Sequence, residues 1–173
     1  MMSDFDLPQM RDWSSPALDK YVARSLLHLD AALSDVIARC AGRLVYLATP
    51  YSKLARCDNG QFDHGASLGA AFWAARWARL LAYHGITAVS PVIQAVEMVH
   101  SERLENMLDP LDAQFWEGWC RPLLAASGVV VVPPIRGWQD SDGIWVEVCD
   151  ALRAHKHVLQ IDAAVPSGWM SDD

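Results

Sequence analysis

The segment Asp140–Glu147, with the sequence DSDGIWVE, carries the residue types with the clearest chemical use in this chain. It follows the apolar run Val129–Val132, which is typical of a buried strand, and it leads into a helix-forming stretch. A turn from a strand into a helix exposes backbone N–H groups that bind anions. The spacing therefore predicts that Glu147 lies one turn inside the helix, beside the anchored end of a phosphorylated or polyhydroxylated ligand.

Three side chains are candidates for the catalytic groups. A carboxylate that is ionised inside a crevice is a natural nucleophile for an acetal-like carbon such as C1′ of a sugar, and Glu147 fits that role. The alternative is a solvated carboxylate favoured by the helix dipole. Tyr46 could orient the nucleophile through its hydroxyl, or it could be a core tyrosine. Asp112 could point into the same crevice, or it could cap its helix.

Polar turns after the predicted strands supply candidates for ligand contacts, because parallel strands present their carboxyl ends at one edge of a sheet. In the loop 51–65, Arg56 could grip a phosphate in bidentate fashion, although surface loops commonly carry such cations. Trp138 lies beside the Ser/Gly turn. The candidates for substrate binding are Ser141, Gly143, Thr49, Pro50, Tyr51, Arg56, Ser90 and Trp138.

These side chains need an α/β scaffold, and the order of the predicted elements supplies one. Strands are predicted at 43–48, 86–89, 128–132 and 157–161, and helices at 66–84, 111–126 and 143–155. Residues 92–107 are predicted to be irregular to helical. Strands that alternate with helices indicate a mostly parallel sheet that is covered on both faces.

The N-terminal part precedes this pattern. Residues 1–13 are predicted to form a mobile arm. From Ser15, apolar residues recur at helical spacing as far as Ile37, and Gly42 closes this extension. We therefore divide the chain into an N-terminal arm and helix (1–42), an α/β domain (43–165) and a C-terminal tail (166–173).

The bulk composition excludes several classes of protein. A net charge of −7 and 14 basic residues argue against binding to duplex nucleic acid. We see no signal peptide and no apolar run of about 18 residues, so a membrane span is not expected. The cysteines Cys40, Cys57, Cys120 and Cys149 form no Cys-x-x-Cys pair, which favours reduced thiols in a cytoplasmic protein.

No cofactor or metal is expected. The histidines His84, His100, His155 and His157 lack the spacing of metal ligands, and no dinucleotide turn, phosphate loop or nucleophile elbow occurs. Of the eight tryptophans, those at positions 73, 77, 116 and 119 fall at helical spacing. They favour a core or a subunit interface, and a homodimer or higher homo-oligomer is expected.

Taken together, several segments resemble the nucleoside 2-deoxyribosyltransferase-like superfamily. They are Val45–Ser52, Ser90-Pro91, Asp112 with Phe115-Trp116, and above all Ser141-x-Gly143-x-x-x-Glu147. The resemblance covers about residues 43–161. It is greatest to uncharacterised bacterial and phage proteins that are related to 2′-deoxynucleoside 5′-monophosphate N-glycosidases.

The resemblance implies a three-layer, flavodoxin-like or Rossmann-like domain with a mostly parallel five-stranded sheet. It also implies cleavage or exchange of an N-glycosidic bond through a covalent glycosyl-enzyme intermediate. Glu147 would attack C1′ while Tyr46 orients it, and Asp112 would contact the sugar hydroxyl or assist the departing base. Ser141 and the Gly143 N–H would hold the 5′ group. The Arg that relatives carry directly after the first strand is deferred here to Arg56.

Four functions remain open at this point. Nucleotide hydrolysis is the preferred one, because Ser141 and the nearby cations fit a monophosphate. Deoxyribosyl transfer differs only in whether a second base or water intercepts the intermediate. A nucleotide-binding sensor would use the same pocket without turnover. An assembly protein would use the Trp-rich helices as an interface and leave the pocket vestigial.

Overall fold

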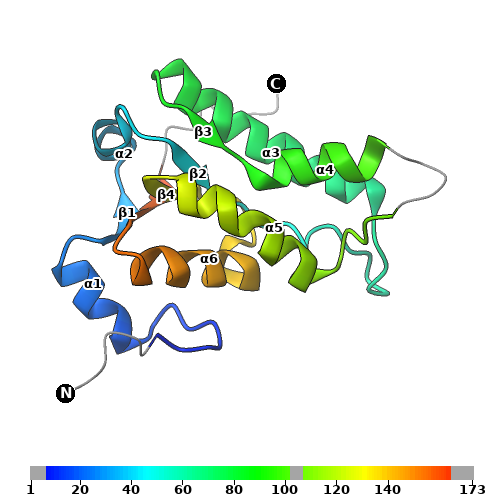
Figure 1. The fold of residues 1–173 in the computed structure, drawn as a ribbon, viewed down its shortest axis with the longest axis horizontal. Coiled ribbons are helices and arrows are strands. Elements are labelled where there is room, and N and C mark those ends of the chain that lie inside the picture. Colours follow the sequence, from blue (N-terminus) through cyan, green and yellow to red (C-terminus); the bar gives the residue numbers. More distant parts are fainter. Residues whose placement is uncertain (1–6, 102–106, 165–173) are drawn as a thin grey trace.

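A five-stranded, all-parallel sheet forms the centre of the structure (Figure 1), a computed structural model that describes residues 7–101 and 107–164. The spatial order of the strands is β1-β5-β4-β2-β3. The α/β class and the flavodoxin- or Rossmann-like sheet are therefore confirmed. The strands are β1 (Leu27–Ala31), β2 (Val45–Leu47), β3 (Ala88–Val89), β4 (Val129–Val132) and β5 (His157–Ile161).

The described residues form six α-helices, five of which cover the two faces of this sheet. Helices α1, α5 and α6 bury their apolar sides on one face, while α2 and α3 bury theirs on the other. Helix α4 packs against α3, and α5 and α6 lie side by side (Figure 1). The helices are α1 (Asp19–Ala23), α2 (Leu33–Cys40), α3 (His64–Tyr83), α4 (Pro91–Ser101), α5 (Ala113–Ala126) and α6 (Asp142–Arg153), with short 3-10 turns at Pro16–Leu18 and Trp138–Asp140.

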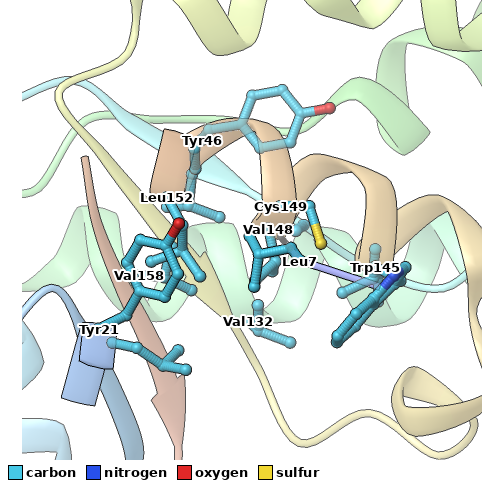
Figure 2. Packing of buried hydrophobic residues seen from close by; sticks show 14 of the residues in the cluster. Leu7, Tyr21, Tyr46, Val132, Trp145, Val148, Cys149, Leu152 and Val158 are labelled. Carbon is cyan, nitrogen blue, oxygen red and sulfur yellow. The ribbon is translucent and has the colours of Figure 1, made fainter. Parts of the chain in front are cut away.

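The central strand β4 shows why the core has two halves. All four of its valines are buried, because both faces of a parallel sheet are covered by helices. Val130 and Val132 pack toward α5 and α6, and Val129 and Val131 toward α2 and α3. Tyr46 of β2 shares the α5/α6 side, and Figure 2 shows its hydroxyl directed away from the apolar side chains around it.

The N-terminal extension is helical only in part. Leu27–Ala31, which the apolar spacing placed within a helix, forms edge strand β1 and pairs with β5. Helix α1 ends because Ser25 adopts a left-handed conformation with φ 56°. The Ser25 and Leu26 N–H groups then donate to Val22 and Tyr21 carbonyls, at 2.9 Å each, which is a Schellman ending. Glycine usually fills this position, so the sequence held no obvious stop signal.

The described part of the predicted mobile arm is packed against the domain. Leu7 is buried, and the Pro8 carbonyl accepts a 3.1 Å hydrogen bond from Trp145 Nε1. The Trp13 ring lies edge-on to both Trp138 and Trp145. The prediction of mobility is therefore wrong for residues 7–13, whose aromatic and carbonyl groups have partners on the loop and helix after β4.

The remaining predicted elements match the structure within a few residues. Most of the stretch predicted to be irregular to helical forms helix α4, which ends at Ser101. Residues 102–106 of that stretch lie outside the described part of the chain. The same holds for the C-terminal tail, 166–173. Within the described ranges, no helix combines the length and apolarity that a bilayer crossing requires.

Lys156, between α6 and β5, ties these two elements to the end of α5. Its Nζ donates to the carbonyls of Leu124 at 2.9 Å and Ala125 at 2.8 Å, and also to the Ser127 carbonyl. The last carbonyls of a helix have no partner within the helix, and a cation there also complements the helix dipole. Lys156 therefore fixes α5 relative to α6.

Replacing Lys156 with Met should lower the free energy of unfolding by about 2 kcal/mol, because several carbonyls lose a charged donor. Chemical denaturation of the wild type and the variant measures this difference. Arg39, an exposed cation in the last turn of α2, provides the matched control. Arg39→Met should change the value by less than about 0.5 kcal/mol. Equal effects of the two substitutions would show that Lys156 does not lock α5 in place.

Candidate active site

The candidate site is built around one hydrogen bond between the sheet and α6. Tyr46, fully buried in β2, donates from its hydroxyl to Glu147 Oε1 at 2.6 Å. The two residues are 101 positions apart in the sequence. Glu147 stands in the second turn of α6, and Tyr46 lies on the sheet face that α6 covers. The structure thus brings together the two side chains that the sequence assigned to nucleophile and orienting group.

Burial changes the acidity of this carboxyl group. Glu147 is partly buried, and the loss of solvation raises its pKa from 4.5 to about 7. The Tyr46 hydrogen bond opposes this rise because it stabilises the carboxylate, whereas the negative charge of Asp150 adds to it. Burial also raises the pKa of Tyr46, and the adjacent Glu147 carboxylate raises it further. At neutral pH the phenol therefore stays protonated and remains a donor.

A third group in this site, Cys120 of α5, was missed at the sequence level. Its side chain packs on the same cluster as Tyr46, and the nearby thiol contributes to the raised pKa of Tyr46. Burial raises the pKa of the thiol to about 11, and the Glu147 charge contributes to the rise. The thiol therefore stays protonated at neutral pH. An isolated cysteine in an apolar helix resembles any buried small residue, so no pattern in the sequence indicated its role.

A cavity of about 330 Å³ opens where the loops after β2 and β4 meet. Lys53 and Arg136 bring positive charge to its wall, and Asp140 brings a carboxylate. Its lining residues are Pro50, Tyr51, Lys53, Leu54, Arg136, Gly137, Asp140 and Ser141. Two predicted turns therefore converge on one hollow at the carboxyl ends of the strands, where ligands of such folds bind.

The Ser/Gly turn lies between this cavity and the helix that carries Glu147, and Glu147 itself is not among the lining residues. Ser141 is buried, and its Oγ accepts from the Ile144 N–H at 3.3 Å as the N-cap of α6. Gly143 is exposed in the first turn. Trp138 packs edge-on against Trp13 and is not among the cavity-lining residues. Ser141 is therefore the predicted contact that links cavity and helix.

Two further predicted contacts are buried hydroxyls that lack a partner among the described residues. Thr49 Oγ1 follows β2, and Ser90 Oγ follows the adjacent strand β3. Thr49 and Ser90 are 6% and 5% exposed, so both side chains are almost fully enclosed. A buried hydroxyl without a hydrogen bond costs free energy. Such groups are uncommon, and here both stand at the functional edge of the sheet.

Arg56 and Asp112 are engaged in local structure. The Arg56 guanidinium donates to the Ser52 and Gly60 carbonyls of its own loop, at 3.2 and 3.4 Å. It is not among the residues lining the cavity. The Asp112 carboxylate is exposed and accepts from the Phe115 N–H at 3.0 Å, which makes it the N-cap of α5. Neither side chain contacts Glu147 within the described structure.

Tyr51 combines a place in the cavity wall with a buried network behind it. Its hydroxyl lies 3.0 Å from Ser67 Oγ, and His100 Nε2 lies 3.1 Å from the same oxygen. This network fixes the orientation of the Tyr51 ring. In the described parts of the chain, no three His, Cys, Asp or Glu side chains are grouped closely enough to hold a metal ion.

Comparison with known proteins assigns most of the chain to a family. Residues 43–163 match a family model described as "Domain of unknown function (DUF1937)". Neither the search of curated proteins nor that of solved structures returned a significant match. The matched range contains Tyr46, the cavity-lining residues and Glu147.

The two opposing influences on Glu147 can be separated by substitution. Tyr46→Phe should raise the pKa of Glu147 above about 7, since the carboxylate loses its donor, whereas Asp150→Asn should lower it by removing a like charge. Titration of the side-chain carboxyl carbon by NMR measures each value. If both substitutions move the pKa in the same direction, or neither moves it, the stated electrostatic account of Glu147 is incorrect.

Proposed function

We propose that this chain, which belongs to the DUF1937 family, hydrolyses the N-glycosidic bond of a (deoxy)nucleoside 5′-monophosphate. The observation that supports this most directly is the 2.6 Å hydrogen bond from Tyr46 to Glu147. It holds one carboxylate oxygen and leaves the other for attack. The reaction would be nucleophilic substitution at C1′ with a covalent intermediate.

The proposed reaction has two steps. In the first, the ionised Glu147 carboxylate forms a bond to C1′ as the C1′–N bond breaks. The electron pair of that bond passes to the base, which takes up a proton from water. In the second, water attacks C1′ and loses a proton to the hydroxide left by the first step, which releases the Glu147 carboxylate and yields the free sugar 5-phosphate. Tyr46 keeps its proton throughout, in keeping with its raised pKa, and orients the carboxylate.

The cavity supports the choice of a nucleotide. It adjoins Ser141, which caps the helix that carries Glu147, and Lys53 and Arg136 supply charge suited to a phosphate. The Ser141-x-Gly143-x-x-x-Glu147 spacing is similar to that of the nucleoside 2-deoxyribosyltransferase-like superfamily. The contact of Asp112 with the sugar hydroxyl stays part of the proposal: one carboxylate oxygen caps α5, the other is left for the ligand, and Asp112 is not among the cavity-lining residues.

Incubation with each deoxynucleoside and ribonucleoside 5′-monophosphate should release free base, detectable by chromatography. Glu147→Gln should reduce the rate by roughly a thousandfold or more, because the amide is not a nucleophile. Glu117→Gln, an exposed glutamate on α5 that pairs with Arg121, is the matched control and should retain the wild-type rate.

The same assay separates hydrolysis from the alternatives. A new nucleotide formed when a second base is added would indicate transfer, since the intermediate is shared. Nucleotides that raise the melting temperature without any release of base would indicate a binding module. Full activity of Glu147→Gln would contradict the nucleophile assignment.

The rate should also depend on pH in a defined direction. Since Glu147 must be ionised to attack and its pKa is raised to about 7, kcat/KM should rise with pH through neutrality and level off above about pH 8. Initial rates from pH 5 to 9 give the midpoint. A rate that is already maximal at pH 5 would mean that no group with this pKa acts as the nucleophile.

A further inference from the structure

Lys53, a cation of the cavity wall, is paired with a carboxylate that lies just outside the set of lining residues. Asp142, in the first turn of α6, forms an ion pair with Lys53 at 3.1 Å and another with Arg11. Lys53 and Arg11 both also donate to the Asp140 carbonyl, at 2.6 and 2.7 Å. Asp142 therefore joins the N-terminal segment, the loop after β2 and the start of α6.

This arrangement neutralises one of the two cations of the cavity wall. Lys53 lines the cavity, and its charge is directed at Asp142. Arg136, the other cation of the wall, makes no ion pair or side-chain hydrogen bond with any residue in 7–101 or 107–164. An anionic group that enters the cavity would thus meet Arg136 directly, but it would compete with Asp142 for Lys53.

The position of Asp142 does not adapt freely to such a ligand. Arg11, whose side chain is only 23% exposed, holds the Asp142 carboxylate from the N-terminal side. The segment around Arg11 is fixed in turn, because Trp13 Nε1 donates to the Gln139 carbonyl at 3.0 Å and Trp145 Nε1 to the Pro8 carbonyl at 3.1 Å. The negative charge therefore stays beside Lys53 when a ligand enters.

We propose that Asp142 and Arg136 together set how strongly this cavity favours phosphorylated over unphosphorylated ligands. Arg136 binds the anionic group, and Asp142 acts as an internal competitor that weakens its binding. The inference rests on the proposed function for the identity of the ligand as a sugar phosphate. It assigns opposite effects to two residues at the same site, which a general loss of structure would not produce.

Binding of 2-deoxyribose 5-phosphate and ribose 5-phosphate tests this, since neither has a glycosidic bond to cleave. Titration calorimetry at low salt should show roughly fivefold tighter binding by Asp142→Asn, as a partly exposed charge contributes modestly. Arg136→Gln should bind the sugar phosphates roughly fivefold more weakly. The unphosphorylated sugars should bind all variants alike. Both effects should shrink at high salt, because exposed charges are screened.

Matched controls exist for both substitutions. Asp35, an exposed acid in the first turn of α2, controls for removal of a first-turn carboxylate. Arg79, exposed near the end of α3, controls for removal of a surface arginine. Asp35→Asn and Arg79→Gln should leave sugar phosphate binding unchanged. Melting temperatures of all four variants show whether each remains folded.

Several results would overturn the inference. These are unchanged or weaker sugar phosphate binding by Asp142→Asn, unchanged binding by Arg136→Gln, equal effects on sugars and sugar phosphates, or no binding by any form of the protein. Failure of the proposed function gives a different result, namely no release of base from nucleotides. The inference would survive that failure if the two substitutions still shifted sugar phosphate affinity in opposite directions.

Discussion

The arrangement of the site depends on a carboxylate that α6 places against a tyrosine of the sheet. Tyr46 belongs to β2, which is flanked by β4 and β3, so its hydroxyl cannot shift without moving the sheet. Glu147 is fixed by the docking of α6, which Ser141 starts and Lys156 holds against α5 from the other end. The short hydrogen bond between them is thus a consequence of the whole α/β packing rather than of a local turn.

The place of Glu147 in α6 could be predicted because its determinants are local in sequence, whereas the contact with Tyr46 forms only when α6 packs on the sheet. An apolar strand followed by a Ser/Gly turn fixes where a helix begins, and Glu147 then lies in its second turn. The edge strand β1 could not be predicted in the same way. Its side chains fit helical spacing, and the end of α1 at Ser25 used no glycine. Whether such a segment becomes a strand is decided by pairing with β5, a contact between distant parts of the chain.

The cations near the cavity also show which features could be predicted from the sequence and which could not. The sequence analysis chose Arg56 because an arginine in this polar loop can grip a phosphate in bidentate fashion, but the guanidinium donates to two carbonyls of its own loop. Arg136 and Lys53 line the cavity instead, from two loops that meet only in the folded protein. Cys120 was overlooked for the same reason, since its contact with Tyr46 exists only after α5 packs on the sheet. The residue types predicted which chemistry the site could perform. Which side chains contact one another could be seen only in the folded structure.

Burial of the Glu147 carboxylate lowers the free energy of unfolding at neutral pH, which indicates that this residue serves function rather than stability. A carboxyl whose pKa rises from 4.5 when unfolded to about 7 when folded binds its proton more tightly in the native state. Its contribution to stability is therefore present below about pH 4.5 and is lost as pH rises to about 7, which amounts to as much as about 3 kcal/mol. An apolar residue at position 147 would avoid this loss. The unpartnered hydroxyls of Thr49 and Ser90 add a further penalty at the same edge of the sheet. Unfavourable groups of this kind concentrate where a protein binds or transforms a ligand, because the ligand supplies the missing partners.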